Sequence, residues 1–207
     1  MIHLATKIES LPRSPEAHGA ENDAAATERP HKLLNLERPT AELLYMLVTG
    51  GRRRRILEIG TSNGYSAIWL ACATGRNSGE PLVTIERDAA KAGEARENLR
   101  RAGVQERARV IEGDATQLCA ALNGPFDCVF FDADRVSAPA QLEALLPKLT
   151  GDSWLLADNA LSHPDEIAGY IAAVSALPGF DSMTVPVGKG LHIAQRRATA
   201  YAKGSAA

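Results

Sequence analysis

Short runs of apolar residues alternate with longer stretches of helical periodicity along most of the chain. Apolar runs without polar alternation are typical of strands that are buried on both faces of a parallel sheet. Five such runs predict strands at residues 56–59, 81–86, 108–112, 125–132 and 153–158. Helices are predicted between these strands at residues 66–71, 88–102, 116–122 and 140–149, and the leucines of the last segment are spaced for one helical face.

The alternating region ends in a different pattern. Ser162 with Asp165 resembles a capping box, which predicts a helix to about Leu177. Two further strands follow at 180–187 and 191–196, joined by a glycine-rich turn that predicts a hairpin. The chain is therefore predicted to be an α/β protein with a mostly parallel seven-stranded sheet, an antiparallel hairpin at its C-terminal edge, and helices on both faces.

The predicted sheet sets the boundaries of a single domain. Thr40 can cap a helix that runs to Val48, directly before the first strand. We assign residues 1–34 to an N-terminal arm that is partly helical or mobile, residues 35–197 to one domain, and residues 198–207 to a tail. The length of 207 residues suits one sizeable α/β domain.

Composition narrows the choice of partners and compartment. The formal net charge is −2, so no global basic field calls for nucleic acid or an anionic membrane. We interpret the basic run at 52–55 as a solvated loop, with a phosphate or RNA contact as the alternative. The chain has no apolar run of 18 residues, we expect no signal peptide because residues 1–11 are too polar, and the three cysteines lack metal-ligand spacing. We therefore expect a protein of the reducing cytoplasm with no membrane association.

The turn after the first predicted strand is the strongest candidate for a ligand site. Glu58 stands near the end of that strand, Gly60 and Gly64 permit a tight turn, and Ser66 opens the next helix. Such a turn brings backbone N–H groups to the carboxyl edge of the sheet, where open α/β folds bind ligands. We expect Glu58 to point into this crevice toward an ammonium group, and Ser66 to hydrogen-bond a carboxylate.

The same turn argues against a dinucleotide. A G-x-G-x-x-G fingerprint starting at Gly60 would need glycine in place of Ser62 and Tyr65. Glu86 ends the second predicted strand, where a carboxylate can hold a ribose diol. A nucleoside cofactor with a cationic tail fits this combination, and S-adenosyl-L-methionine has that chemistry.

Asp114 and Ala115 follow the third predicted strand. The Asp114 carboxylate can accept a hydrogen bond from an adenine amino group, with Ala115 against the ring. As an equally plausible alternative, Asp114 caps the helix that begins beside it.

Three oxygen-bearing side chains stand at the carboxyl ends of the fourth and fifth strands: Asp132, Asp158 and Asn159. Two carboxylates and an amide oxygen suit a small divalent ion, Mg²⁺ with Mn²⁺ or Ca²⁺ as alternatives, rather than Zn²⁺. Taken singly, each residue is also common as a turn residue after a strand.

These motifs together resemble the cation-dependent O-methyltransferases, the caffeoyl-CoA and catechol O-methyltransferase group, and in particular its short bacterial members. The resemblance covers about residues 35–197 and rests on the segments 58–66, 113–115, 131–134, 158–159 and 186–190.

The resemblance implies a Rossmann-like class I methyltransferase domain and, often in this family, a homodimer. S-adenosylmethionine would be held by Leu36, Glu58, Gly60, Ser66, Glu86, Asp114, Ala115 and Asp132. The metal ligands would be Asp132, Asp158 and Asn159, and the reacting centre would lie at Asp132 and Arg135.

Two features depart from the family pattern. Arg135 stands where the family commonly has a lysine proposed as the general base, and the segment after Asn159 is short. Arginine cannot act as a base near neutral pH, so Arg135 can only stabilise an oxyanion or hold an acidic group. His163 is a substitute base in principle, but we interpret it as a surface residue in the first turn of a helix.

The predicted reaction is direct methyl transfer to a hydroxyl group of a small, catechol-like aromatic acceptor chelated by the metal, which lowers the pKa of that hydroxyl. Three alternatives are a methyltransferase acting on a hydroxylated tRNA wobble uridine, a non-catalytic protein that binds S-adenosylmethionine, and a nicotinamide oxidoreductase. The net charge disfavours tRNA as the acceptor. The presence of Asp132, Asp158 and Asn159 disfavours a non-catalytic protein, and Ser62 and Tyr65 disfavour a nicotinamide cofactor.

Overall fold

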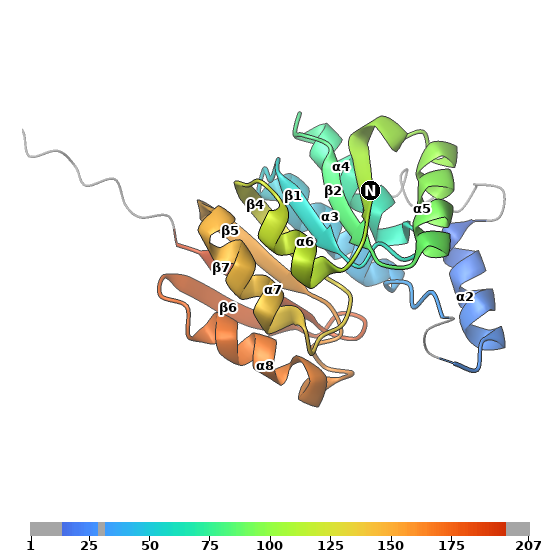
Figure 1. Ribbon diagram of the computed structural model, residues 1–207. Coiled ribbons are helices and arrows are strands. Elements are labelled where there is room, and N and C mark those ends of the chain that lie inside the picture. Colours follow the sequence, from blue (N-terminus) through green and yellow to red (C-terminus); the bar gives the residue numbers. More distant parts are fainter. Residues whose placement is uncertain (1–13, 29–31, 198–207) are drawn as a thin grey trace, which may run out of the picture.

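The computed structural model describes residues 14–28 and 32–197, and a seven-stranded sheet forms its centre (Figure 1). The strands are β1 (Ile56–Ile59), β2 (Leu82–Glu86), β3 (Ala108–Glu112), β4 (Phe126–Phe131), β5 (Leu149–Ala157), β6 (Phe180–Val185) and β7 (Leu191–Arg196). Their order across the sheet is β3-β2-β1-β4-β5-β7-β6. The first five strands are parallel, and β7 is antiparallel to both β5 and β6. The predicted α/β fold and its antiparallel edge are confirmed.

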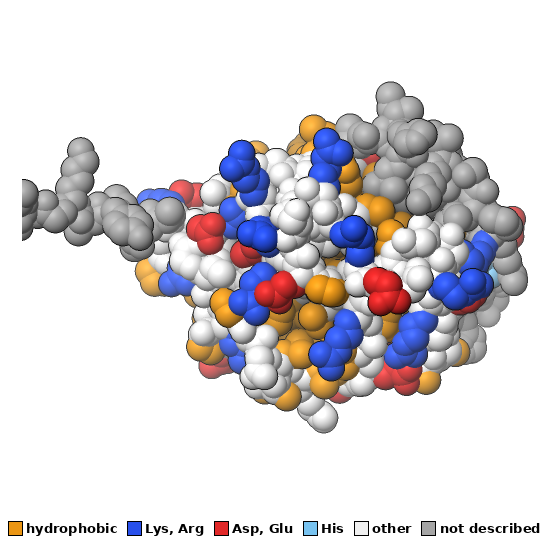
Figure 2. Space-filling model, turned by 90° about the horizontal axis from the view of Figure 1, so that it is seen from above, with side chains coloured by type: hydrophobic (Ala, Val, Ile, Leu, Met, Phe, Trp, Pro, Cys, Tyr) orange, Lys and Arg blue, Asp and Glu red, His pale blue; other side chains and the backbone are white. Residues whose placement is uncertain are grey.

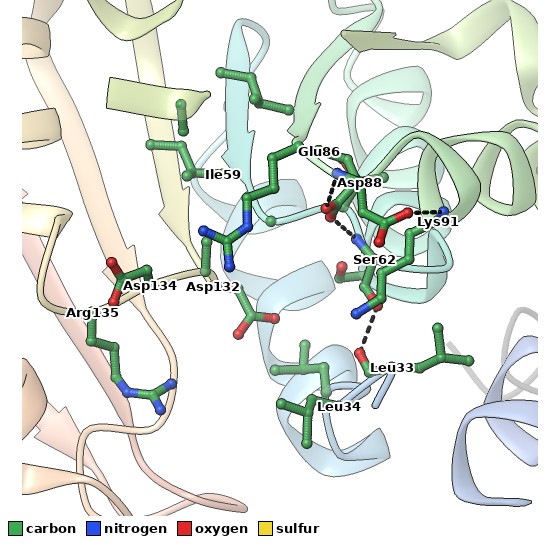
Figure 3. Close-up of a pocket in the computed structure, with 18 of the residues that line it drawn as sticks. Leu33, Leu34, Ile59, Ser62, Glu86, Asp88, Lys91, Asp132, Asp134 and Arg135 are labelled. Atoms are coloured by element: carbon green, nitrogen blue, oxygen red, sulfur yellow. Dashed lines mark hydrogen bonds between the residues drawn. The ribbon is translucent and has the colours of Figure 1, made fainter. Parts of the chain in front are cut away.

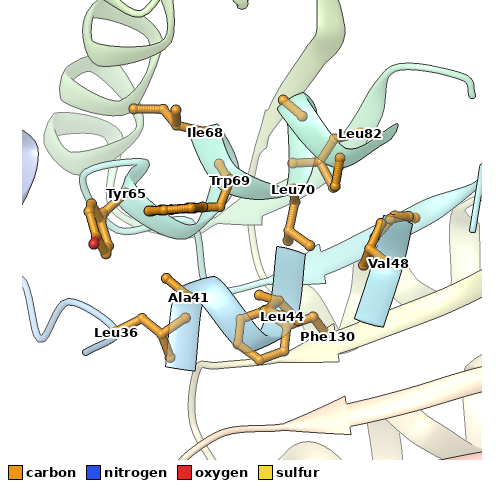
Figure 4. Packing of buried hydrophobic residues seen from close by; sticks show 14 of the residues in the cluster. Leu36, Ala41, Leu44, Val48, Tyr65, Ile68, Trp69, Leu70, Leu82 and Phe130 are labelled. Carbon is orange, nitrogen blue, oxygen red and sulfur yellow. The ribbon is translucent and has the colours of Figure 1, made fainter. Parts of the chain in front are cut away.

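Helices cover both faces of the sheet. One face carries α3 (Arg38–Gly50), α4 (Tyr65–Arg76) and α5 (Ala89–Arg101), and the other carries α6 (Ala115–Ala121), α7 (Ala138–Leu145) and α8 (Pro164–Ser175). Leu44 and Val48 of α3 pack with Trp69 of α4 in the first core (Figure 4). In the second core, Leu142 and Tyr170 pack against the opposite face of the sheet.

Side chains of β1 alternate between the two hydrophobic cores. All four residues of β1 are buried. Leu57 and Ile59 belong to the core under α7 and α8, whereas Ile56 belongs to the core under α3 and α4. Successive side chains of a strand point to opposite faces, so Glu58 lies on the Ile56 side.

Two predicted helix caps are wrong. Helix α3 begins at Arg38 after Glu37, so Thr40 lies inside its first turn and does not cap it. Helix α8 begins at Pro164, and Ser162 with Asp165 makes no capping box there. Proline sets the start of both helices, since it is favoured in the first turn, where the missing N–H has no intrahelical partner.

Two boundaries around β5 also differ from the prediction. Strand β5 begins at Leu149, earlier than the predicted residue 153, and α7 ends at Leu145. A short 3₁₀ turn, Leu146–Lys148, fills the gap. Pro147 explains the early end of the helix, because proline cannot continue an α-helix without losing a hydrogen bond.

The described part of the N-terminal arm contains helix α2 (Pro15–Ala25) and packs on the turn that follows β1. The Pro15 carbonyl accepts hydrogen bonds from the side-chain amides of Asn35, at 2.8 Å, and Asn63, at 3.0 Å. Asp23 accepts from the backbone N–H of Leu33 at 2.7 Å. Residues 1–13 and the predicted tail at 198–207 lie outside the described residues. Among the described helices, none has the length and apolar character needed to cross a membrane.

Candidate cofactor and acceptor site

A cavity of about 750 Å³ opens at the carboxyl edge of the parallel strands. The turn after β1 and the ends of β2, β3 and β4 form its wall, and residues 32–36 lie across it (Figure 3). Most of the predicted site residues line it: Leu36, Gly60, Ser66, Glu86, Asp114, Ala115, Asp132, Arg135 and Asn159. The structure therefore brings all the predicted cofactor residues except Glu58, and two of the three predicted metal ligands, into one space.

Gly60 allows the β1 turn to approach β4. Its φ of 103° lies in the left-handed region, and a Cβ atom there would stand 2.3 Å from the carbonyl oxygen of Asp132. A side chain at this position would push the two strand ends apart. The turn and Asp132 can therefore share one cavity only because residue 60 is glycine.

Glu86 is fixed at the tip of β2 by two backbone groups. Its Oε2 accepts from the N–H of Ser62 at 2.8 Å, and its Oε1 accepts from the N–H of Asp88 at 3.0 Å (Figure 3). Each carboxylate oxygen can accept a further hydrogen bond. The carboxylate is thus held in one orientation on the cavity wall, with acceptor capacity left for a diol.

The structure confirms that Asp114 caps a helix, and its contact with adenine stays a prediction. Its Oδ1 accepts from the backbone N–H of Gln117 at 3.0 Å and caps α6. Asp114 and Ala115 also line the cavity. Capping therefore orients Asp114 without removing it from the site.

Glu58 lies beneath the cavity and not in its wall. The side chain has no exposed surface, and Glu58 is not among the described residues that line the cavity. Thr84 Oγ1 donates to Glu58 Oε2 at 2.6 Å, and Oε1 is buried without a partner among the described residues. Burial raises the pKa of Glu58 to about 7, against the opposing effect of the Ser66 and Thr84 hydroxyls.

Asp132 and Asp158 form a carboxylate pair at the ends of β4 and β5, in which Asp158 is buried and Asp132 is partly exposed to the cavity. Burial raises the pKa of Asp158 to about 6, and burial together with repulsion from Asp158 raises the pKa of Asp132 well above its usual range. Asn159, at φ 64°, donates through Nδ2 to Asp158 Oδ2 at 2.7 Å. Asp158 Oδ1 is buried and has no partner in the described structure. A cation between these oxygens would relieve their repulsion.

The acidic pair alone does not make a conventional metal cluster. Within residues 14–28 and 32–197, no three His, Cys, Asp or Glu side chains are grouped so that they could hold a metal ion. The predicted set of Asp132, Asp158 and Asn159 has two acids and one amide, so its third ligand is of a weaker kind. The unpartnered Oδ1 of Asp158 and the repulsion between the acids are the observations that fit a bound cation.

The far end of the cavity carries cationic side chains. Arg135 lies beyond Asp132 as seen from Glu86 (Figure 3), and its Nη2 forms an ion pair with Glu166 at 2.8 Å. Lys189 lines the same end and forms an ion pair with Glu37 at 2.7 Å. Both cations are thus held in place by acids outside the Asp132–Asp158 pair.

A family model described as "Methyltransferase domain" matches residues 57–160, half of the chain, and spans the turn, Glu86 and the carboxylate pair. The chain belongs to the class I S-adenosylmethionine O-methyltransferase family. It is 35% identical over 143 residues to the catechol O-methyltransferase of Mycobacterium tuberculosis, which covers 69% of this chain and 62% of that protein. The matched stretch thus spans about three fifths of that relative.

Solved structures of other methyltransferases agree with the fold over nearly the whole length. An O-methyltransferase from Bacillus cereus in complex with SAH has a TM-score of 0.73 and 28% identity, covering 87% of this chain and 90% of that chain. The O-methyltransferase TomG from Streptomyces achromogenes, in complex with SAM, has a TM-score of 0.73 and 26% identity, covering 94% and 89%.

Several residues that line the cavity are not among those predicted from the sequence. Lys189 was interpreted as part of a hairpin turn, although its glycine neighbours on both sides signal a close approach. His163 was assigned to the surface, but it precedes α8 and lines the cavity. Residues 32–34 also line it, and Ser62 Oγ donates to the Leu33 carbonyl at 2.6 Å. These contacts join parts of the chain that are far apart in the sequence, so no local sequence pattern predicts them.

Proposed function

We propose that this protein is an S-adenosylmethionine-dependent O-methyltransferase that acts on a small hydroxylated aromatic acceptor with a divalent cation. One observation carries the proposal: the β1 turn, Glu86, Asp132 and Asn159 line a single cavity, and Asp158, buried outside its wall, forms a carboxylate pair with Asp132. The first group suits a nucleoside cofactor, and the second suits a cation that chelates the acceptor.

The residues fit the cofactor by their chemistry. Glu86 would hold the ribose diol, and Asp114 with Ala115 would hold the adenine. Gly60, Ser66 and Leu36 would border the methionine end, where the unpartnered Oε1 of Glu58 offers a counter-charge for the ammonium group. When bound, S-adenosylmethionine supplies the methyl group together with its own leaving group, so no protein nucleophile is required.

The carboxylate pair fits a divalent cation. Asp132, Asp158 and Asn159 would hold it, with Mg²⁺ favoured because all three offer oxygen. The ion would lower the pKa of an acceptor hydroxyl. The chain itself contributes orientation: Asn159 holds Asp158 through a 2.7 Å hydrogen bond and thereby directs Oδ1 away from that contact.

Arg135 is best suited to charge stabilisation. Its guanidinium stays protonated near neutral pH and cannot remove a proton. Its ion pair with Glu166 restrains it at the acceptor end of the cavity. We therefore assign Arg135 to the stabilisation of negative charge on the acceptor, with Asp132 beside it at the reacting centre.

A small acceptor is better supported than tRNA. On the face that Figure 2 shows, basic side chains are spread out with acidic ones between them, rather than gathered in one patch. Within the 52–55 run, Arg53 pairs with Asp152 and Arg55 pairs with Glu80. The relative from M. tuberculosis is named a catechol O-methyltransferase, which favours a catechol-like acceptor for this chain as well.

The remaining assignments are also proposals. Residues 35–197 would form the catalytic domain. The three cysteines are free thiols, which supports a reducing, cytoplasmic setting. The homodimer rests on the family resemblance alone.

Two measurements test the proposed function. Calorimetric titration with S-adenosylhomocysteine and, separately, with NAD should show binding of the former alone. Methyl transfer from labelled S-adenosylmethionine should then label small dihydroxy aromatics rather than bulk tRNA. Binding of NAD but not S-adenosylhomocysteine would contradict the cofactor assignment. Methylation of tRNA alone would show that the acceptor is tRNA and not a small aromatic compound.

A further inference from the structure

A buried chain of hydroxyl groups links the floor of the cofactor site to Glu58. Thr84 lies opposite Glu58 in the β1–β2 register. Its Oγ1 donates to Glu58 Oε2 at 2.6 Å and also lies 2.6 Å from Thr61 Oγ1. Glu58 and Thr84 have no exposed surface, and Thr61 is 1% exposed. Water therefore does not compete for these hydrogen bonds.

The direction of the chain follows from proton counting. A threonine hydroxyl has one hydrogen to donate. When Thr84 donates that hydrogen to the Glu58 carboxylate, the short contact with Thr61 requires Thr61 to be the donor. One threonine of β2 thus receives a hydrogen bond from the turn and passes one to the acid of β1.

The chain leaves one carboxylate oxygen available. Thr84 occupies Oε2 of Glu58, whereas Oε1 has no partner among the described residues. A buried, unpartnered carboxylate oxygen is costly and is satisfied best by a charged donor. The Ser66 hydroxyl also acts on this carboxylate, but Thr84 is the residue that holds Oε2 at 2.6 Å and so leaves Oε1 as the oxygen without a hydrogen-bond partner.

We propose that Thr84 is a positioning residue for the amino-acid end of the cofactor, and that it acts by holding Glu58 with Oε1 free for the ligand's ammonium group. The inference rests on the proposed function, because it needs a cofactor with an ammonium group. It assigns a role to a residue that touches neither the cavity nor, in our proposal, the ligand.

Thr61 separates this role from simple support of the turn. Thr61 contacts Thr84 but not Glu58, and the next residue, Ser62, donates its N–H to Glu86. Loss of the Thr61 hydroxyl would loosen the turn and leave the Thr84–Glu58 bond in place. Loss of the Thr84 hydroxyl would break both bonds.

The test compares two ligands in calorimetric titrations of the full chain. S-adenosylhomocysteine carries the amino-acid end, whereas 5′-methylthioadenosine lacks it. We expect Thr84→Val to weaken S-adenosylhomocysteine binding about 10- to 100-fold, the range for a hydrogen bond to a charged group, and to leave 5′-methylthioadenosine within about twofold of the parent. Thr84→Ser keeps the hydroxyl and should restore the parent affinity.

Thr74→Val is the matched control. Thr74 is 1% exposed and donates only to helix carbonyls, those of Leu70 at 3.2 Å and Ala71 at 3.0 Å. It therefore reports the cost of removing a buried threonine hydroxyl away from Glu58. If Thr84→Val does not fold, as judged by its thermal transition, Thr84→Ala provides the same comparison.

The outcomes separate the inference from the proposed function. If the parent protein fails to bind S-adenosylhomocysteine, the proposed function is wrong and the inference falls with it. If the parent binds but Thr84→Val binds equally well, only the inference is overturned. Equal loss of both ligands would also overturn it, since Thr84 would then support the whole turn.

Discussion

Replacing Glu58 with glutamine should stabilise the ligand-free protein at alkaline pH. Burial raises the pKa of Glu58 from 4.5 to about 7. The folded protein therefore holds a proton on Glu58 more tightly than the unfolded chain does. Glu58 contributes most to the free energy of unfolding below about pH 4.5, and this contribution is lost as the pH rises through 7. Glutamine, which is uncharged and of similar size, has no such dependence.

The magnitude follows from the two pKa values. A tenfold change in a protonation equilibrium is worth about 1.4 kcal/mol, so the rise from 4.5 to about 7 corresponds to about 3 kcal/mol. We expect Glu58→Gln to exceed the parent in stability by under about 1 kcal/mol near pH 5 and by about 3 kcal/mol near pH 8. The same change should weaken binding of S-adenosylhomocysteine, because the counter-charge for its ammonium group is lost.

Urea unfolding of both proteins without ligand, from about pH 5 to pH 8, measures the effect as the difference between their free energies of unfolding. Glu97→Gln on α5 is a suitable control, because Glu97 is an exposed acid paired with Arg100. Parallel stability curves for the parent and Glu58→Gln across this range would refute the reasoning. Glu58 would then be ionised in the ligand-free protein at no cost.

Three further predictions concern the cavity. Glu86→Ala should weaken S-adenosylhomocysteine binding by about 1.5–3 kcal/mol in calorimetry, the range for a hydrogen bond to a charged group. If the variant binds as tightly as the parent, Glu86 does not bind the ribose. Chelation by EDTA should abolish turnover and Mg²⁺ should restore it, whereas Asp158→Ala and Asn159→Ala should keep the fold by circular dichroism and lose metal-supported turnover. Arg135→Lys should retain more activity than Arg135→Ala, and His163→Ala should change the rate little. If His163→Ala alone abolished the dependence of the rate on pH, His163 would be identified as the base.

The sequence was sufficient for the fold because its signals are local. The five apolar runs of the parallel strands and the glycine-rich hairpin turn appear in the structure at nearly the predicted positions. The carboxyl ends of parallel strands share one edge, so Glu86 and Asp132 could be expected to line one cavity. The helix starts were harder to predict, because Pro39 and Pro164 compete with polar capping residues nearby.

The burial of Glu58 was not expected from the sequence. Its side chain lies on the Ile56 side of β1, is completely buried, and is not among the described residues that line the cavity. The alternation between Leu57, Glu58 and Ile59 contained that information. Thr84 gave no comparable signal, since a threonine in a buried strand is common and its partner lies on another strand.

The N-terminal contacts could not be predicted from sequence at all. Pro15 meets Asn35 and Asn63 through its carbonyl group, and a carbonyl is present on every residue. Lys189 meets Glu37 across a separation of most of the chain. Such pairings depend on how completed elements pack, not on spacing within one segment.

The most direct test of the central claim is methyl transfer from labelled S-adenosylmethionine to catechol and to its monohydroxy analogue phenol, each with Mg²⁺ and with EDTA. The claim requires a cation that chelates two adjacent oxygens, held by Asp132, Asp158 and Asn159. We predict O-methylated product from catechol with Mg²⁺ and none from phenol or in EDTA. Equal labelling of catechol with Mg²⁺ and in EDTA would contradict the account.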